Sequence, residues 1–293
     1  MKILITGASG LLGRALMKEL TRYQPIGTAY SRADNGLIKV DLCDAASVDH
    51  AITQTQPDII IHAAAERRPD VSQNNPEAAL ALNVAATEHL AKLAKQHHAW
   101  LLYISTDYVF DGTKSPYRPQ DLPNPVNFYG QSKWQGEQAI WQITHHAGVL
   151  RIPILYGPVE YLSESAVTAL LKPLLEKVPH PKIDNWGIRY PTLVDDIAVV
   201  CRQLAERAYQ QKAFSGIWHW SNDQALTKYE MVKIMADILS LPTHHIIAIN
   251  QPEDTVPRPY QNQFDCSDLI SLGIGQKTDF TQWMKQHLMP LVM

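Results

Sequence analysis

The stretch KILITGASGLLG, residues 2–13, decides the fold of this chain. Its first half is an apolar run that predicts a buried β-strand, and its second half opens a run with the apolar spacing of a helix. Between them lies the pattern T-G-x-x-G-x-x-G, which in this context is typical of a turn that binds the pyrophosphate of a dinucleotide. We interpret Gly7 as permitting the tight turn, Gly10 as letting the backbone approach the pyrophosphate, and Gly13 as allowing close helix–strand packing.

A helix that begins directly after such a turn offers backbone N–H groups and a partial positive charge to the phosphates. An ordinary glycine-rich turn is the alternative, but the position at the N-terminus and the correct flanks favour a binding site. The expected cofactor contacts in the turn and the start of the helix are Gly7, Ser9, Gly10, Leu11, Leu12 and Gly13.

Strands and helices alternate through the first half of the chain. This order predicts βαβ units and an α/β fold with a doubly wound parallel sheet, the Rossmann arrangement. The second long helix should begin at Pro76, with Asn75 as its N-cap. The other expected strands lie at 26–30, 38–40, 58–62, 100–105 and 149–155, and the expected helices at 11–23 and 76–96.

After Leu155 prolines become frequent and the regular rhythm is lost. We therefore predict a dinucleotide-binding domain over residues 1–155 and a smaller substrate-binding region over residues 156–293, interleaved with the sheet domain. Within the second region, Thr227 and Glu230 form a capping box, which predicts a helix from there to Leu239.

Composition excludes several classes of function. The net charge of -3 gives no electrostatic basis for binding nucleic acid or an acidic membrane surface, and no window approaches the about 20 apolar residues of a membrane span. The cysteines, at positions 43, 201 and 266, form no CxxC pair, and the adjacent histidine pairs have no third ligand in register. We therefore expect no metal and a reducing compartment. The N-terminus lacks the pattern of a signal peptide, so the expected location is the cytoplasm.

The end of the second predicted strand indicates the kind of dinucleotide. NAD enzymes usually place an Asp or Glu there, which binds the ribose 2′-hydroxyl. Here Tyr30, Ser31 and Arg32 stand instead, and a guanidinium can bind a 2′-phosphate while a serine hydroxyl donates a hydrogen bond. We therefore expect NADP, with NADPH preferred over NADH. The adenine should reach the end of the third strand, at Asp41 and Leu42.

Thr106, Tyr129 and Lys133 form a complete catalytic set for carbonyl reduction. Tyr129 and Lys133 fit Y-x-x-x-K and share one face of a helix, and Thr106 closes a buried strand at the edge of the sheet where ligands bind. A tyrosine with a pKa near 10 is a poor acid at neutral pH. We expect the adjacent ammonium and the positive charge of the nicotinamide to lower that pKa. The Thr106 hydroxyl can hydrogen-bond the substrate oxygen, and Lys133 can also hold the nicotinamide ribose.

Nearly the whole chain resembles the extended short-chain dehydrogenases of the dTDP-4-dehydrorhamnose reductase family, which reduce a 4-keto nucleotide sugar with a nicotinamide cofactor. Related sugar dehydratases follow the catalytic threonine with Asp-Glu, whereas Tyr108 replaces that Glu here, so dehydration is not expected. The resemblance rests on the glycine turn, on Ala63, Ala64 and Ala65, on STDYVF at 105–110, on NFYG at 127–130 with Lys133, and on Arg258 and Pro259.

A second resemblance, closer in detail, is to the regulatory β subunits of methionine adenosyltransferase. It rests on ERRPDV at 66–71, LRIPILYG at 150–157, DCS at 265–267 and LGIGQ at 272–276. Those subunits belong to the same superfamily, bind NADP and support a catalytic partner. The resemblance implies cofactor contacts at Ser9 to Leu12, Tyr30 to Arg32, Asp41, Leu42, Ala63, Arg67, Tyr129 and Leu155.

The leading expectation is NADPH-dependent reduction of a 4-keto nucleotide sugar, with Tyr129 as the proton donor. The alternative is an NADP-binding regulatory subunit whose partner is a methionine adenosyltransferase. The regulatory subunits continue past this region in a C-terminal tail, which favours the reductase. The sequence leaves a homodimer open and does not fix the sugar. We also expect His62, Trp186, Trp218 and Trp220 to pack in the core, and leave open whether Asn83 bonds the active-site backbone.

Overall fold

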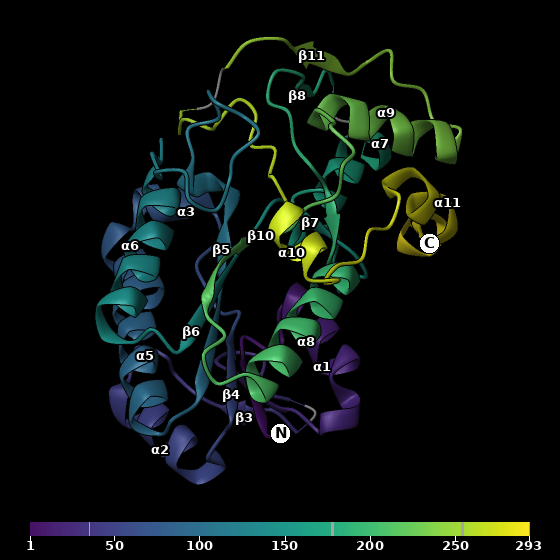
Figure 1. Cartoon of the computed structure of the whole chain (residues 1–293). Helices are drawn as coiled ribbons and strands as arrows, with labels where there is room; N and C mark the ends of the chain where they lie inside the picture. Colours follow the sequence, from purple (N-terminus) through teal and green to yellow (C-terminus); the bar gives the residue numbers. More distant parts are fainter. Residues whose placement is uncertain (35, 177–178, 253–254, 293) are drawn as a thin grey trace.

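Seven parallel strands form the central sheet in the part of the chain that the structure describes (Figure 1). The computed structural model describes residues 1–34, 36–176, 179–252 and 255–292. Across the sheet the strands follow the order β10-β6-β5-β4-β1-β2-β3. Their bounds are β1 (Ile3–Thr6), β2 (Ile26–Ala29), β3 (Ile38–Lys39), β4 (Ile59–His62), β5 (Trp100–Thr106), β6 (Ala147–Ile152) and β10 (Gly216–His219).

The strand order reverses between β1 and β4. The chain runs outward from β1 to β2 and β3, and then returns to place β4 on the other side of β1. Thr6 is in register with Thr28 of β2 and His62 of β4, so the three strands end at the same edge. In open α/β sheets ligands bind at this carboxyl edge, at the point of reversal. The predicted doubly wound parallel sheet is therefore confirmed.

Helices cover both faces of the sheet (Figure 1). Helices α2, α5 and α6 lie on one face, and α1 and α8 pack together on the other. Every residue of β4 and β5 is buried as a result, which explains their continuous apolar runs. The helices are α1 (Leu11–Glu19), α2 (Ala45–Thr55), α3 (Pro69–Asn74), α4 (Pro76–Leu80), α5 (Ala86–Gln96), α6 (Phe128–Ile143), α7 (Lys172–Leu175), α8 (Val194–Gln210), α9 (Lys228–Leu239), α10 (Ser267–Ser271) and α11 (Phe280–Val292).

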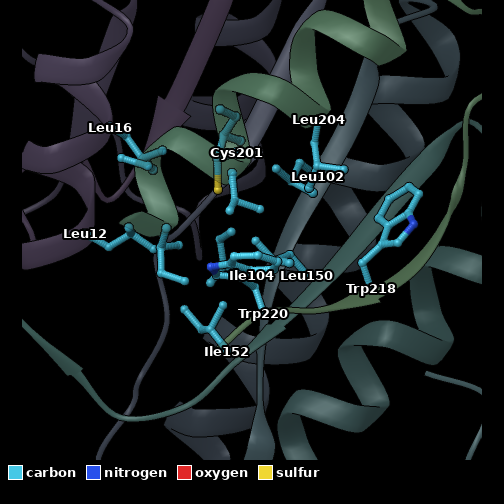
Figure 2. Packing of buried hydrophobic residues seen from close by; sticks show 14 of the residues in the cluster. Leu12, Leu16, Leu102, Ile104, Leu150, Ile152, Cys201, Leu204, Trp218 and Trp220 are labelled. Carbon is cyan, nitrogen blue, oxygen red and sulfur yellow. The ribbon is translucent and has the colours of Figure 1, made fainter. Parts of the chain in front are cut away.

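The largest hydrophobic core lies between the sheet and the pair α1 and α8 (Figure 2). Leu16 of α1, Leu102 of β5 and Leu204 of α8 are fully buried there. Trp218 and Trp220 join the same core, as the sequence predicts. Trp186, for which we expected the same, is only half-buried and packs on the ring of Tyr260. The second half of the chain therefore supplies part of the core of the sheet half, through α8 and the residues of β10 and beyond.

The remaining C-terminal segments form a smaller layer over the carboxyl edge of the sheet (Figure 1). Its own core packs α9 and α11 around Tyr156, Phe280 and Trp283. In the described residues, none of the helices is long and apolar enough to cross a membrane. The short strands of this layer pair as β7 with β9 and β8 with β11. Their bounds are β7 (Leu155–Tyr156), β8 (Lys182–Asp184), β9 (Thr192–Leu193) and β11 (Ile247–Ile249).

Three expected elements differ from the sequence analysis in their extent. The strand expected at 149–155 ends at Ile152, because Pro153 has no N–H for the ladder, and the chain then forms β7. The helix expected at 76–96 contains a π turn at Ala81–Ala85, and the helix expected at 11–23 ends at Glu19. Both predicted caps are confirmed: Asn75 accepts from the Ala78 N–H, and the Thr227 capping box is complete.

We predict that Leu102→Ala lowers the free energy of unfolding by about 2–5 kcal/mol, because a fully buried leucine leaves a cavity in a close-packed core. The matched control is Leu122→Ala, since the Leu122 side chain is 82% exposed and its loss should cost less than about 0.5 kcal/mol. Urea denaturation followed by circular dichroism measures both. Equal losses in the two variants would contradict this account of the core.

Candidate active site

One cavity of about 730 Å³ lies at the carboxyl edge of the sheet. Its lining extends from the turn after β1, past the ends of β2, β4 and β5, to the start of α6. The structure brings every residue that the sequence analysis assigned to a site into this one lining. These are Gly7, Ser9, Gly10, Leu11, Leu12, Gly13, Tyr30, Ser31, Arg32, Asp41, Leu42, Ala63, Ala64, Ala65, Arg67, Thr106, Tyr129, Lys133 and Leu155.

The glycine turn is shaped by close backbone contacts. Gly7 has a φ of +70°, and a Cβ there would lie 2.9 Å from the backbone of Ala64, which follows β4. A Cβ on Gly13 would lie 2.1 Å from the carbonyl oxygen of Gly7, so only glycine lets α1 pack on the turn. Gly10 is the N-cap of α1 and supplies no side-chain cap. The backbone N–H groups at the start of α1 therefore face the cavity in an arrangement that fits a phosphate.

A second glycine contact brings the catalytic residues together. A Cβ on Gly130 would lie 2.0 Å from the carbonyl oxygen of Tyr108, in the turn after β5. The start of α6 therefore lies against the end of β5, where Thr106 is located. Asn127 caps α6 by accepting from the Gly130 N–H at 3.0 Å. The rings of Tyr108 and Tyr129 meet edge to face, with centroids 5.8 Å apart, which holds Tyr129 beside Thr106.

Burial dominates the electrostatics of the catalytic set. Burial raises the pKa of Tyr129 above its usual value, and a hydrogen bond with Thr106 opposes the rise. Burial lowers the pKa of Lys133 to about 7, and the nearby Glu137 carboxylate opposes that change. From the sequence we expected the Lys133 ammonium to lower the pKa of Tyr129. The residues of the protein alone do not have that effect, because Lys133 is itself buried and, with a pKa of about 7, is only partly protonated at neutral pH.

A buried ion pair lies beneath Lys133. Glu137 accepts from Arg151 at 3.0 and 2.7 Å, and both side chains are 2% exposed. Glu137 also accepts from the Ser105 hydroxyl at 2.5 Å, next to Thr106 in β5. The Lys133 Nζ lies 3.9 Å from the centroid of the Tyr103 ring. Two adjacent strands and α6 are therefore joined by charge and hydrogen bonds directly under the catalytic residues.

Two polar residues named in the sequence analysis prove to be structural supports. His62 bonds the hydroxyls of Thr6 and Thr87, and burial lowers its pKa to about 3, so it is the predicted core histidine. Asn83 bonds both the N–H and the carbonyl of Glu66, at 2.9 and 3.0 Å. This clamp fixes the backbone next to Arg67, which settles the question left open for Asn83.

Sequence reasoning missed Arg189, a buried residue of the cavity lining. Its Nη1 donates to the carbonyls of Ile188, Pro259 and Tyr260, whereas its Nη2 has no hydrogen-bond partner in the described residues. A Cβ on Gly187 would lie 2.5 Å from that Nη2, so glycine makes room for the guanidinium. No motif surrounds Arg189, and only its position in the fold reveals it.

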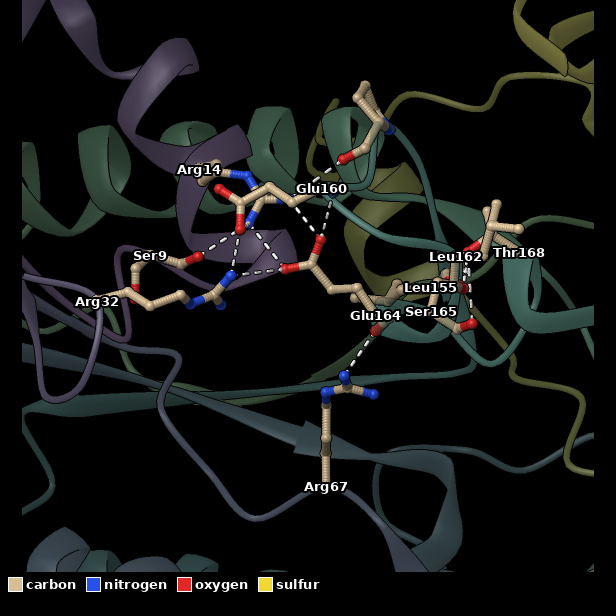
Figure 3. Close-up of polar contacts among 11 residues, drawn as sticks. Ser9, Arg14, Arg32, Arg67, Leu155, Glu160, Leu162, Glu164, Ser165 and Thr168 are labelled. Atoms are coloured by element: carbon tan, nitrogen blue, oxygen red, sulfur yellow. Dashed lines mark hydrogen bonds and ion pairs between the residues drawn. The ribbon is translucent and has the colours of Figure 1, made fainter. Parts of the chain in front are cut away.

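Asp107 and the acidic residues of the C-terminal half were also missed. Burial raises the pKa of Asp107 to about 7, although Arg189 opposes the rise. Glu164 lies in the cavity lining and bonds Arg14 at 2.8 and 2.7 Å (Figure 3).

Among the described residues, no group of three or more His, Cys, Asp or Glu side chains is placed to hold a metal ion.

Comparison with known proteins shows which family this chain is similar to. The family model described as RmlD substrate binding domain matches residues 1–293. Methionine adenosyltransferase 2 subunit beta of Xenopus tropicalis is 47% identical over 99% of this chain and 88% of its own length. A dTDP-4-dehydrorhamnose reductase of Aggregatibacter actinomycetemcomitans is 31% identical over 80% of this chain and 78% of its own. The structure of the Bacillus anthracis dTDP-4-dehydrorhamnose reductase, in complex with NADP, has a TM-score of 0.83 at 24% identity, covering 99% of each chain.

The fold and the arrangement of this cavity define an extended short-chain dehydrogenase/reductase. Within that class, the chain belongs to the family of the RmlD substrate binding domain. The roles of the individual site residues remain predictions.

The buried Lys133 leads to a prediction about stability. In the unfolded chain its pKa is near 10.5, whereas in the folded protein it is about 7. Between these values only the unfolded chain holds the proton, so the stability of the wild type rises as the pH rises. Lys133→Met should therefore raise the free energy of unfolding at pH 7 by about 1–4 kcal/mol. The gain should shrink by about 1.4 kcal/mol for each pH unit above 7.

The control is Lys92→Met, which removes an exposed lysine paired with Glu88 on α5. Its effect should not depend on pH between 7 and 9, because the Lys92 side chain is 58% exposed and is in contact with water in the folded as well as the unfolded chain. Denaturation at pH 7, 8 and 9 measures both variants. The same pH dependence in the two would mean that Lys133 keeps an ordinary pKa.

Proposed function

We propose that this protein is an NADPH-dependent reductase of a 4-keto nucleotide sugar, similar to dTDP-4-dehydrorhamnose reductase. The observation that carries the proposal is that Thr106, Tyr129 and Lys133 line the same cavity as the glycine turn. A protein that only binds a dinucleotide does not need all three side chains in that place. The family of the chain and its 31% identity to a dTDP-4-dehydrorhamnose reductase support the same conclusion.

The chain's own residues supply the proton chemistry. A nicotinamide cofactor, when bound, supplies a hydride to the carbonyl carbon. The Tyr129 hydroxyl donates a proton to the carbonyl oxygen, and the Thr106 hydroxyl donates a hydrogen bond to the same oxygen as negative charge develops. Lys133 holds the nicotinamide ribose and, when protonated, stabilises the phenolate that remains. Thr106 and Lys133 are buried, and their burial limits the access of water to the reacting oxygen.

NADP is the proposed cofactor. Ser31 and Arg32 lie at the end of β2 and line the cavity where the sequence analysis expects the 2′-phosphate. The glycine turn and the start of α1 fit the pyrophosphate, as the contacts of Gly7 and Gly13 indicate. The Arg32 side chain is 39% exposed and can be reached from the cavity.

Arg189 supports an anionic substrate. It lines the cavity near Asp107 and Tyr108, and its Nη2 is a buried donor without a hydrogen-bond partner in the described residues. A buried guanidinium in that state is an expected binding site for phosphate oxygens. Arg258 also lines the cavity and forms an ion pair with Asp70 at 3.1 Å. In this proposal the two arginines bind the diphosphate of a nucleotide sugar, and the keto group lies against Thr106 and Tyr129.

A second candidate function is that of a regulatory subunit of methionine adenosyltransferase. The observation in its favour is the 47% identity over 99% of the chain to such a subunit. Tyr129 and Lys133 would then hold the nicotinamide ribose without catalysis.

Under either function we propose a cytoplasmic location, in keeping with three free thiols. A homodimer stays a further proposal that only a measurement of oligomeric state can address.

We predict that Tyr129→Phe abolishes turnover and leaves the affinity for NADPH within a few fold of the wild type. Phenylalanine keeps the ring contact with Tyr108 and loses only the hydroxyl that transfers the proton. Steady-state kinetics and fluorescence titration measure the two properties separately. Turnover at the wild-type rate would show that another group is the acid.

We also predict that the wild type oxidises NADPH when dTDP-4-dehydrorhamnose or a similar 4-keto nucleotide sugar is supplied. The loss of absorbance of the reduced nicotinamide follows the reaction. The same preparation should not co-elute with a methionine adenosyltransferase in size-exclusion chromatography. If NADPH is not oxidised with any sugar of such a panel, and the protein co-elutes with a methionine adenosyltransferase, the reductase proposal is wrong and the regulatory function takes its place.

A further inference from the structure

Residues 157–165 cross from the C-terminal layer to the dinucleotide half of the cavity, and we refer to them as the strap. The strap follows β7 and carries two glutamates, Glu160 and Glu164 (Figure 3). They face arginines from separate parts of the dinucleotide half: Arg14 on α1 and Arg32 after β2. The two glutamates differ in burial, and this difference separates their roles.

Glu164 is the fixed end of the strap. Its side chain is 2% exposed and binds the Arg14 guanidinium through both carboxylate oxygens. Its main-chain carbonyl accepts from the Arg67 Nη2 at 2.6 Å. The next residue, Ser165, donates to the Leu155 carbonyl at 2.7 Å. Breaking these contacts would leave a buried charge without its partner, so this end of the strap stays in place.

Glu160 is the exposed end. Its side chain is 49% exposed and forms an ion pair with the Nη1 of Arg32, which is 39% exposed. Glu160 also lies 3.6 Å from the Nη1 of Arg14, which is already bonded to Glu164 and to the Ser9 carbonyl. The buried Glu164 in turn lies 3.5 Å from the Nη1 of Arg32. An ion pair between two exposed side chains contributes little to stability, because water screens the charges and both side chains lose conformational freedom in the pair. The Glu160–Arg32 pair can therefore open without disturbing the rest of the strap.

We infer that Glu160 is a specificity-determining residue, which reduces the preference for NADP over NAD by competing with the 2′-phosphate for Arg32. The inference rests on the proposed cofactor site. It assigns to a residue of the second half of the chain a role that dinucleotide-binding proteins usually give to a residue directly after β2.

Two physical effects of Glu160 lower the affinity for NADP relative to that for NAD. A 2′-phosphate must displace the Glu160 carboxylate from Arg32 and then lies close to it, so the two anions repel each other. A ribose 2′-hydroxyl has no charge and can donate a hydrogen bond to the same carboxylate, as it does to the acidic residue of NAD-binding proteins. Glu160 therefore weakens the binding of NADP and does not weaken the binding of NAD.

The test is Glu160→Gln, measured as binding and without any sugar substrate. Fluorescence titrations with NADPH and NADH should show that the ratio of their affinities rises about three- to tenfold in favour of NADPH. The matched control is Glu88→Gln, which removes an equally exposed ion pair on α5 and should leave the ratio unchanged. An unchanged or lowered ratio in Glu160→Gln would overturn the inference.

A double variant identifies Arg32 as the route of the effect. In an Arg32→Ala background, Glu160→Gln should change the ratio by less than about twofold, because the competition has been removed. The same change in both backgrounds would mean that Glu160 does not act through Arg32. A wild type that binds neither dinucleotide would overturn the proposed function itself. A wild type that binds NADPH, with a variant of unchanged ratio, would overturn only this inference.

Discussion

The backbone of Gly7 lies against the backbone of Ala64, and the ligand-binding edge of this protein depends on that approach. A side chain at position 7 would push the turn after β1 away from the end of β4. A side chain at position 13 would push α1 away from the turn. The contact between Gly130 and the Tyr108 carbonyl does the same for α6 and β5. The glycine turn proposed to bind phosphate and the residues proposed for catalysis thus line one cavity because three positions lack a Cβ.

Features encoded by neighbouring residues could be predicted from the sequence. The glycine turn, the Asn75 and Thr227 caps and the end of β5 at Thr106 all depend on local patterns, and the structure has them where they were expected. Pro153 is also a local signal, because a proline in this position ends β6. The single strand that we predicted over 149–155 did not take it into account. The π turn in the helix after Asn75 has no comparable signal in its residues.

Features that join distant segments could not be predicted in this way. The next carboxylate after Arg32 in the sequence is Asp34, yet the carboxylates that pair with Arg32 belong to Glu160 and Glu164. Arg189 likewise reaches the cavity only because the C-terminal layer folds over the edge of the sheet. The pKa values of Tyr129 and Lys133 follow from burial, which depends on the packing of the whole site. Residue types therefore predicted a chemistry for the site, and only the fold revealed the charges around it.

The position of β10 has a consequence for the synthesis of the chain. Residues 216–219 pair with β6, so the outer edge of β6 has no strand beside it until more than two thirds of the chain has left the ribosome. An unpaired edge of a buried, apolar strand is a template for association with other chains. The segments made in between include only the first part of the C-terminal layer, because α9, β11 and α11 follow β10 in the chain. α8 and β10 are made before them and complete the sheet half. The nascent protein is therefore most vulnerable to aggregation in this interval, and its need for chaperones should be greatest there.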